Sequence, residues 1–162
     1  KWERAIIDPS DNSGRDFLNK IVSSDITLDD YIDKARNNHP YDFKVTNGGK
    51  SVVSKRSSYV YRGMVIGGKN TPLFSSARDI GNMAAGIVAA KNGIPWSAAR
   101  AAFDAYQSRN GLQVEGISTR NAEYYGWSQM YRHSNSGYEA TNLKVSIKSL
   151  FRRIYNSVLN MF

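Results

Sequence analysis

Residues 75–92 carry the strongest helical signal in the chain and constrain its fold most. Apolar residues recur there at the spacing of one helix face, and Asn92-Gly93 is a favourable stop. Pro95 then stands at the first-turn position that proline favours in a following helix, which we expect to reach about Tyr106. Both segments are rich in small residues, so the sequence predicts a hairpin of two closely packed helices. The apolar stripe of the first comprises Ile80, Ala84, Ile87 and Val88.

Helical spacing also occurs elsewhere, whereas residues 41–71 are rich in β-branched, aromatic and turn residues that predict short strands or ordered loops. The predicted fold class is therefore mainly α (α+β), with about five helices and a small β or irregular region between residues 41 and 71. We expect one domain over 1–162, in which residues 142–162 form a C-terminal amphipathic helix. The other helical segments lie at 15–22, 28–38 and 119–125, with Ser13 and Thr27 as the expected caps of the first two.

The composition excludes several kinds of site. The chain contains no Cys, which rules out disulfides, thiolate zinc sites, cysteine nucleophiles and iron–sulfur clusters. Its two histidines, His39 and His133, are far apart in sequence, and neither a metal ion nor another cofactor is expected. No apolar run approaches the roughly 20 residues of a transmembrane helix, so we expect no membrane partner. The chain begins at Lys1 and not at Met, which suggests a piece of a longer protein.

The net charge of +8 is distributed unevenly along the chain. Residues 44–78 include seven basic and no acidic residues, which makes a block of +7. A basic surface attracts a polyanion such as nucleic acid, an anionic envelope polymer or an acidic inhibitor protein. The alternative is a solvated surface that only keeps the domain soluble. Arg62 and Arg78 are the candidate substrate-binding side chains of this block.

Two glycines, Gly81 and Gly86, lie inside the helix predicted at 75–92, where each costs about 1 kcal/mol relative to alanine. A helix tolerates this cost where another group must approach closely. We therefore predict a substrate groove that includes both glycines. In this groove Asp79 would act as an acid, a base or an orienting group, and Asn82 as a hydrogen-bond donor.

Helical geometry and capping rules leave structural alternatives for the same residues. The side of the helix with the polar pair carries Asp79, Asn82, Met83 and Gly86. Ser76 and Asp79 have the spacing of a capping box at the helix start. The glycines would equally allow a neighbouring helix to pack closely.

A second candidate site lies at residues 39–44, where a helix end meets the region expected to be extended. It combines the imidazole of His39, the carboxylate of Asp42 and the ammonium of Lys44. Such a set can carry out general acid–base catalysis and stabilise an anionic transition state. In an extended segment Asp42 and Lys44 would share one face. The alternative is an ordered connector with an Asp–Lys pair on the surface.

Four short motifs follow one another in a recognisable order. They are Pro40-Tyr41-Asp42-Phe43-Lys44, Arg78-Asp79-Ile80-Gly81-Asn82-Met83-Ala84-Ala85-Gly86, Gly93-Ile94-Pro95-Trp96 and Tyr106-Gln107. Together they resemble the C-terminal domains called polymorphic toxin type 44, above all versions that end Rhs-type proteins in Bacteroidetes. The resemblance covers roughly residues 31–107, and residues 114–121 lack the acidic segment that many members carry there.

What the resemblance implies is an antibacterial effector domain. Such a domain is cleaved from or carried by a larger exported protein, is delivered into target bacteria, and is neutralised by a cognate immunity protein. The resemblance does not specify the reaction or whether the target lies in the cytoplasm or the periplasm.

The candidate residues favour a metal-independent, ribonuclease-like nuclease. Asp79 or His39 would act as the base. Lys44 and Arg78 would hold the phosphate, and Asn82 would position it.

Two other mechanisms remain open. An envelope-directed hydrolase would act on peptidoglycan or a lipid-linked precursor, with Asp79 and either Glu115 or Glu123 as its acid–base pair. A membrane disruptor would act through residues 142–162, although a helix with such a stripe more often docks onto the core.

Overall fold

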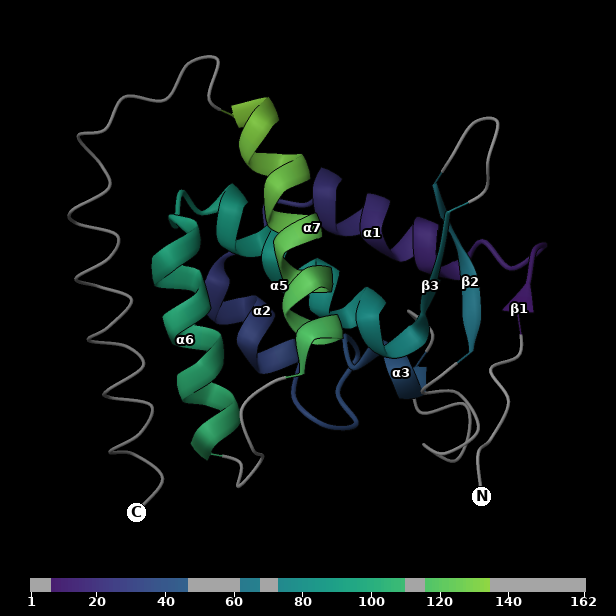
Figure 1. Cartoon of the computed structure of the whole chain (residues 1–162), viewed down its shortest axis with the longest axis horizontal. Coiled ribbons are helices and arrows are strands. Elements are labelled where there is room, and N and C mark those ends of the chain that lie inside the picture. Colours follow the sequence, from purple (N-terminus) through teal and green to yellow (C-terminus); the bar gives the residue numbers. More distant parts are fainter. Residues whose placement is uncertain (1–6, 47–61, 68–72, 110–115, 135–162) are drawn as a thin grey trace.

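Helix α5 (Ala77–Lys91) forms the centre of the fold, as the computed structural model in Figure 1 shows. Nine of its 15 residues are buried, and helices from both earlier and later parts of the chain pack around it. The structure describes residues 7–46, 62–67, 73–109 and 116–134. The predicted C-terminal helix at 142–162 lies outside these residues.

The described residues form six helices and one three-stranded sheet, which confirms the predicted mainly α fold with a small β region. The helices besides α5 are α1 (Ser13–Ser23), α2 (Leu28–Lys34), α3 (Phe43–Thr46), α6 (Trp96–Arg109) and α7 (Ile117–Ser134). The strands are β1 (Ile7–Asp8), β2 (Gly63–Gly67) and β3 (Leu73–Ser76).

The sheet has the order β1-β2-β3 and lies at the end of the molecule where α5 begins (Figure 1). β1 pairs in parallel with β2, with Ile7 opposite Gly63, and β2 pairs antiparallel with β3, with Gly63 opposite Ser76. Ser76 is both the last residue of β3 and the N-cap of α5, so the sheet determines where the helix starts. Of the three strands, only β2 lies in the stretch 41–71 where strands were expected.

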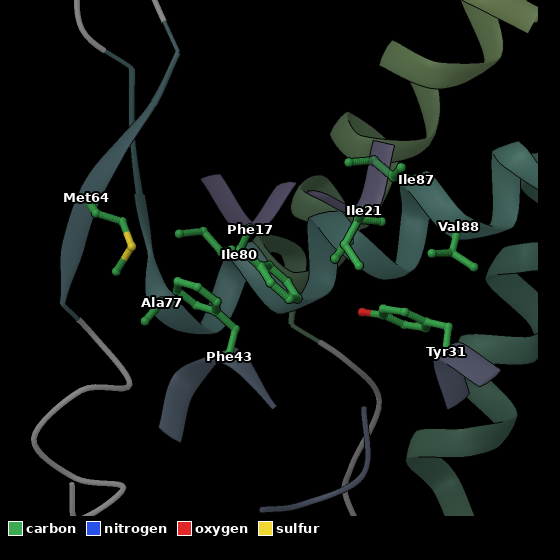
Figure 2. Close-up of a cluster of buried hydrophobic side chains, with 10 residues drawn as sticks. Phe17, Ile21, Tyr31, Phe43, Met64, Ala77, Ile80, Ile87 and Val88 are labelled. Atoms are coloured by element: carbon green, nitrogen blue, oxygen red, sulfur yellow. The ribbon is translucent and has the colours of Figure 1, made fainter. Parts of the chain in front are cut away.

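The main core lies between the sheet, the first three helices and the inner face of α5. Figure 2 shows Phe17 and Ile21 of α1 and Phe43 of α3 facing the side chains of α5. The predicted apolar stripe of α5 is confirmed, because all four of its residues are buried. Met64 of β2 closes the core at the sheet end.

The helix caps agree with the sequence only in part. The predicted cap Thr27 is confirmed, because its side chain accepts a hydrogen bond from the Asp30 backbone N–H at 3.2 Å. Ser13 is instead the first residue of α1, and Asn12 is the N-cap. α2 ends at Lys34, earlier than expected, and its Lys34 carbonyl accepts a hydrogen bond from the Tyr41 N–H at 2.8 Å.

Helix α7 approaches α5 so closely that their backbones are in contact. A Cβ atom on Gly86 would overlap the carbonyl oxygen of Glu123, and one on Gly126 would overlap the carbonyl oxygen of Met83. Only glycine fits at either position, because backbone atoms of the facing helix cannot rotate away as a side chain can. The close helix pair expected at 75–92 and 95–106 is therefore wrong, since α5 makes its closest packing with α7.

Helix α7 is also much longer than the segment predicted at 119–125. Its apolar pattern is weak because Gly126 interrupts it and because large aromatic residues lie on its exposed side, including Tyr124 and Tyr125. The helix owes its stability to the contact with α5 more than to an amphipathic pattern of its own.

Lys91, at the end of α5, ties this helix to α1. Its ammonium donates hydrogen bonds to the carbonyl oxygens of Ile21, Val22 and Ser24, where α1 ends. These carbonyls lack partners within α1, and a cation at this end also interacts favourably with the helix dipole.

We expect Lys91→Met to lower the free energy of unfolding by about 1.5–3 kcal/mol, because three carbonyls lose a charged donor. Urea denaturation followed by far-UV circular dichroism measures the change. Lys34→Met, which changes an exposed lysine at the end of α2 whose ammonium lies over the Tyr41 ring, is the control and should shift stability by only about 1 kcal/mol or less. Equal effects of the two variants would contradict the assigned role of Lys91.

Candidate functional site

The start of α5 is fixed by Ser76 and Asp79. The Asp79 backbone N–H donates to Ser76 Oγ at 3.2 Å, and Ser76 Oγ donates to Asp79 Oδ2 at 2.7 Å. The capping alternative raised by the sequence is therefore realised, with the carboxylate bound to the serine hydroxyl and not to a backbone N–H. Asp79 is half-buried, and its carboxylate has a structural partner at one oxygen.

A partly exposed face of α5 carries Arg78, Gly81, Asn82 and Ala85. We call these four residues the Gly81 face. They have the i, i+3, i+4, i+7 spacing of one helix side and are exposed or half-buried, whereas the residues between them are mostly buried. The grouping predicted from the sequence is corrected here, because Met83 and Gly86 belong to the buried side that contacts α7.

The two helical glycines have opposite surroundings. Gly86 is buried under the α7 backbone, so helix packing explains it and α7 occupies the place predicted for substrate. Beside Gly81 a Cβ would meet no atom of the described residues within 4 Å. Packing among these residues therefore gives no reason for glycine at position 81.

The polar groups of the Gly81 face are only partly engaged. Arg78 is exposed, and its Nη2 donates to Thr119 Oγ1 on α7 at 3.1 Å. Asn82 is half-buried, and its Nδ2 atom is buried with no hydrogen-bond partner among the described residues. A buried amide nitrogen in this state costs free energy until an acceptor reaches it.

Residues 39–44 form a turn that leads into α3 and not an extended segment. Asp42 is 5 % exposed, and its Oδ1 lies 3.0 Å from Lys44 Nζ while its Oδ2 accepts from the Asn38 N–H at 2.8 Å. The Asp42 carbonyl also accepts from the N–H groups of Val45 and Thr46, which starts the helix. The alternation argument for this segment is wrong, although the Asp42–Lys44 ion pair exists.

The Asp42–Lys44 ion pair differs from the surface pair of an ordered connector, which was the structural alternative. Its carboxylate is buried, and only its ammonium is partly exposed. His39 is exposed on the same turn, and its carbonyl accepts from the Asp42 N–H at 2.9 Å. Asn38 precedes it with a φ of 65°, a left-handed conformation that asparagine tolerates better than most residues.

Tyr31 of α2 connects the two candidate segments. Its hydroxyl donates to the carbonyl oxygen of Gly81 at 3.0 Å. Burial raises the pKa of Tyr31 above its ordinary value, and the negative charges of Glu123 and Asp42 raise it further. The 39–44 turn and the Gly81 face thus approach each other around Tyr31. No hydrogen bond or ion pair within the described residues joins that turn directly to Asp79 or Asn82.

The raised pKa of Tyr31 predicts a loss of stability in alkali. The unfolded phenol loses its proton near pH 10 while the folded one keeps it, so the folded state binds more protons there. Tyr31 therefore contributes full stability below about pH 10, and the contribution falls by about 1.4 kcal/mol per pH unit above it. Urea denaturation of wild type and Tyr31→Phe between pH 9 and pH 11, about one unit each side of that value, measures the difference. Parallel curves would show that Tyr31 is not buried as described.

Arg62 precedes β2 and holds the sheet to the start of α1. Its Nη2 lies 3.0 Å from Asp11 Oδ2 and donates to Ser13 Oγ at 3.4 Å. Its carbonyl accepts from the Ala77 N–H, the first residue of α5. The guanidinium predicted to bind substrate thus has an acidic partner within the fold.

Glu123 of α7 lies in a buried ion pair with Arg100 of α6. Glu123 is 3 % exposed, and Arg100 also binds Asp104 through two further hydrogen bonds. The hydrogen bond from Arg100 lowers the pKa of Asp104. A buried, ion-paired Glu123 is poorly placed to serve as the exchangeable acid of an envelope hydrolase. Glu115, the other candidate acid, lies outside the described residues.

Sequence reasoning overlooked two residues that organise this region. Gly126 sets the distance between α5 and α7, and it gave no signal because the helix predicted at 119–125 ended before it. Tyr31 also gave no signal, because a single buried aromatic residue in a short acidic helix is common in cores.

Groups of three or more His, Asp or Glu side chains placed to hold a metal ion are absent from the described part of the chain. Over the same residues, no helix combines the length and the apolar character needed to span a bilayer. Comparisons of the sequence with protein-family models and with curated proteins, and of the fold with solved structures, gave no match.

Proposed function

We propose that this chain is an antibacterial toxin effector domain that cleaves RNA without a metal ion and is neutralised by a cognate immunity protein. The observation that carries the proposal is Gly81. It stands in the central helix at a cost of about 1 kcal/mol relative to alanine, and no neighbour among the described residues requires glycine there. A local rule broken without a structural gain is typical of a functional position.

The charge near this face favours an anionic substrate. Arg78 is exposed on the Gly81 face. The partly exposed Lys44 lies in α3, directly after the turn that approaches this face around Tyr31. Both belong to the block of +7 at residues 44–78. Guanidinium and ammonium groups bind phosphate through charge-assisted hydrogen bonds, and a nucleic acid presents one phosphate per nucleotide.

In the proposed reaction, the 2′-hydroxyl of RNA attacks the adjacent phosphorus. A base, either His39 or Asp79, takes the hydroxyl proton, the bond from phosphorus to the 5′-oxygen breaks, and that oxygen takes a proton from water as it leaves. Arg78 and Lys44 bind the phosphate, with Asp42 holding the lysine ammonium at 3.0 Å.

Asn82 supplies a neutral hydrogen bond to the same phosphate. Its amide nitrogen has no acceptor among the described residues, and a half-turn of the terminal amide exchanges its nitrogen and oxygen. A phosphate oxygen then accepts a hydrogen bond from this nitrogen, while the amide oxygen takes the buried position. This interaction strengthens as negative charge grows on the phosphate in the transition state.

Incubation of the purified chain with total RNA and with plasmid DNA, each with and without a chelator, tests the proposal. We expect RNA to be cleaved at the same rate with and without the chelator, and plasmid DNA, which lacks the 2′-hydroxyl, to stay intact. Intact RNA in a preparation that kills bacteria would overturn it.

Expression directed to either compartment separates this proposal from the envelope hydrolase. A nuclease should arrest growth when the chain is produced in the cytoplasm, and co-production of the cognate immunity protein should restore growth. Toxicity confined to the periplasmic version would favour the hydrolase and reject the nuclease.

A further inference from the structure

Tyr41 lies between two lysines that come from different helices. The Nζ atoms of Lys20 on α1 and of Lys34 on α2 each lie 5.6 Å from the centroid of its ring. The two ammonium groups are therefore at most twice that distance apart. Each lysine stands in the last turn of its helix, where the helix dipole favours a cation, but the dipole does not explain why both converge on one ring.

The ring that receives them is held firmly. It packs edge-to-face on Phe17, with centroids 5.6 Å apart, and lies 6.0 Å from the ring of Tyr31. The Tyr41 backbone N–H also donates to the Lys34 carbonyl at 2.8 Å. Two cations are thus brought to a fixed, half-buried aromatic platform.

Neither ammonium has an acidic partner in the part of the chain that the structure describes. Within the described residues, no carboxylate forms an ion pair with Lys20 or Lys34, although Arg36 close by is paired with Asp33 at 2.8 Å. Two like charges on one platform repel each other, and an anion bound between them removes that repulsion. An aromatic ring beside cations is also the arrangement with which proteins bind single-stranded nucleic acids.

We infer that Lys20, Lys34 and Tyr41 form a binding site for backbone phosphates of single-stranded RNA, distinct from the phosphate that is cleaved. The inference rests on the proposed function for the identity of the polymer. Tyr31 lies between this site and the Gly81 face, because it contacts the Tyr41 ring on one side and the Gly81 carbonyl on the other. We expect one strand to contact both places, with this site holding a part of the strand beside the cleaved bond.

Binding of a 2′-O-methyl oligonucleotide of about 12 nucleotides tests the site without cleavage, since the attacking hydroxyl is blocked. Fluorescence anisotropy across a salt series measures the affinity. We expect Lys20→Gln and Lys34→Gln each to reduce the slope of log affinity against log salt by about 0.7. The matched control is Arg36→Gln, which removes one positive charge that is already paired and should leave the slope nearly unchanged.

Tyr41→Leu provides a second variant that keeps the net charge. It removes the ring to which both lysines are attracted, so the affinity should fall several-fold although no charge is lost. The thermal midpoint of each variant, measured in parallel, confirms that the folded protein is being compared. If Tyr41→Leu is unfolded at the assay temperature, the binding of the two lysine variants decides the result.

The outcomes separate this site from the proposed function. Oligonucleotide binding with the expected loss of slope supports the site even if RNA is never cleaved. Equal losses in the lysine variants and in Arg36→Gln overturn it, because charge alone would then explain binding. Absence of oligonucleotide binding at low salt also overturns the proposed site. So does a result in which these lysines bind an acidic partner protein but not the oligonucleotide.

Discussion

Gly86→Ala is expected to destabilise the protein by about 2–3 kcal/mol. A methyl group at this position would overlap the Glu123 carbonyl oxygen and would lie 2.8 Å or less from atoms of the α7 backbone, including the Trp127 nitrogen. Relief requires α7 to move away from α5 along their whole contact. This loss exceeds the gain of about 1 kcal/mol that alanine brings to a helix interior.

Gly81→Ala is the matched control for this change, since it makes the same substitution in the same helix. Its methyl group would meet no atom within 4 Å in the described part of the chain, so the helix should gain about 1 kcal/mol of stability. Chemical denaturation of both variants measures the difference in the free energy of unfolding. A Gly86→Ala variant as stable as Gly81→Ala would contradict the contact between α5 and α7.

Asn82→Ala is expected to slow RNA cleavage about 100- to 1,000-fold, the cost of removing one donor that stabilises transition-state charge. Stability should stay the same or rise, because the variant removes a buried amide nitrogen that has no partner among the described residues. Initial rates on a fluorescent RNA and the thermal midpoint of the same preparation measure both effects.

Asn92→Ala is the control for this second prediction. The Asn92 amide nitrogen, at the end of the same helix, donates to the Val88 carbonyl at 2.8 Å. Its loss should cost about 1 kcal/mol of stability and leave the cleavage rate unchanged while the protein is folded. A normal rate in Asn82→Ala would remove Asn82 from the site, and an unfolded Asn82→Ala would assign it a structural role.

Local sequence rules predicted the elements that local interactions stabilise. Helix α5 follows from its apolar period and from the spacing of Ser76 and Asp79, and the structure contains both. The sequence did not predict the turn at 39–44 or helix α3. Both depend on Asp42, whose carboxylate accepts from the Asn38 N–H and whose carbonyl accepts from the N–H groups of Val45 and Thr46. The length of α7 was not predicted because the contact with α5 stabilises this helix. The weak apolar pattern of α7 does not indicate that contact.

The residues of the candidate site could be predicted from the sequence, but their relative positions in space could not. Gly81 and Gly86 have the same local cost in a helix, so sequence alone cannot separate the glycine needed for packing from the one that packing does not explain. That distinction depends on where α7 lies. The Asp42–Lys44 pair was also foreseen, whereas its approach to α5 around Tyr31 depends on how α2 packs.

The rate of RNA cleavage by Gly81→Ala tests the central claim most directly. If glycine is kept at position 81 so that substrate can approach the helix, this variant should be more stable than wild type by about 1 kcal/mol and yet cleave RNA at least about tenfold more slowly. A variant that is more stable and cleaves RNA at the wild-type rate would contradict the account, because the Gly81 face would then not contact the substrate.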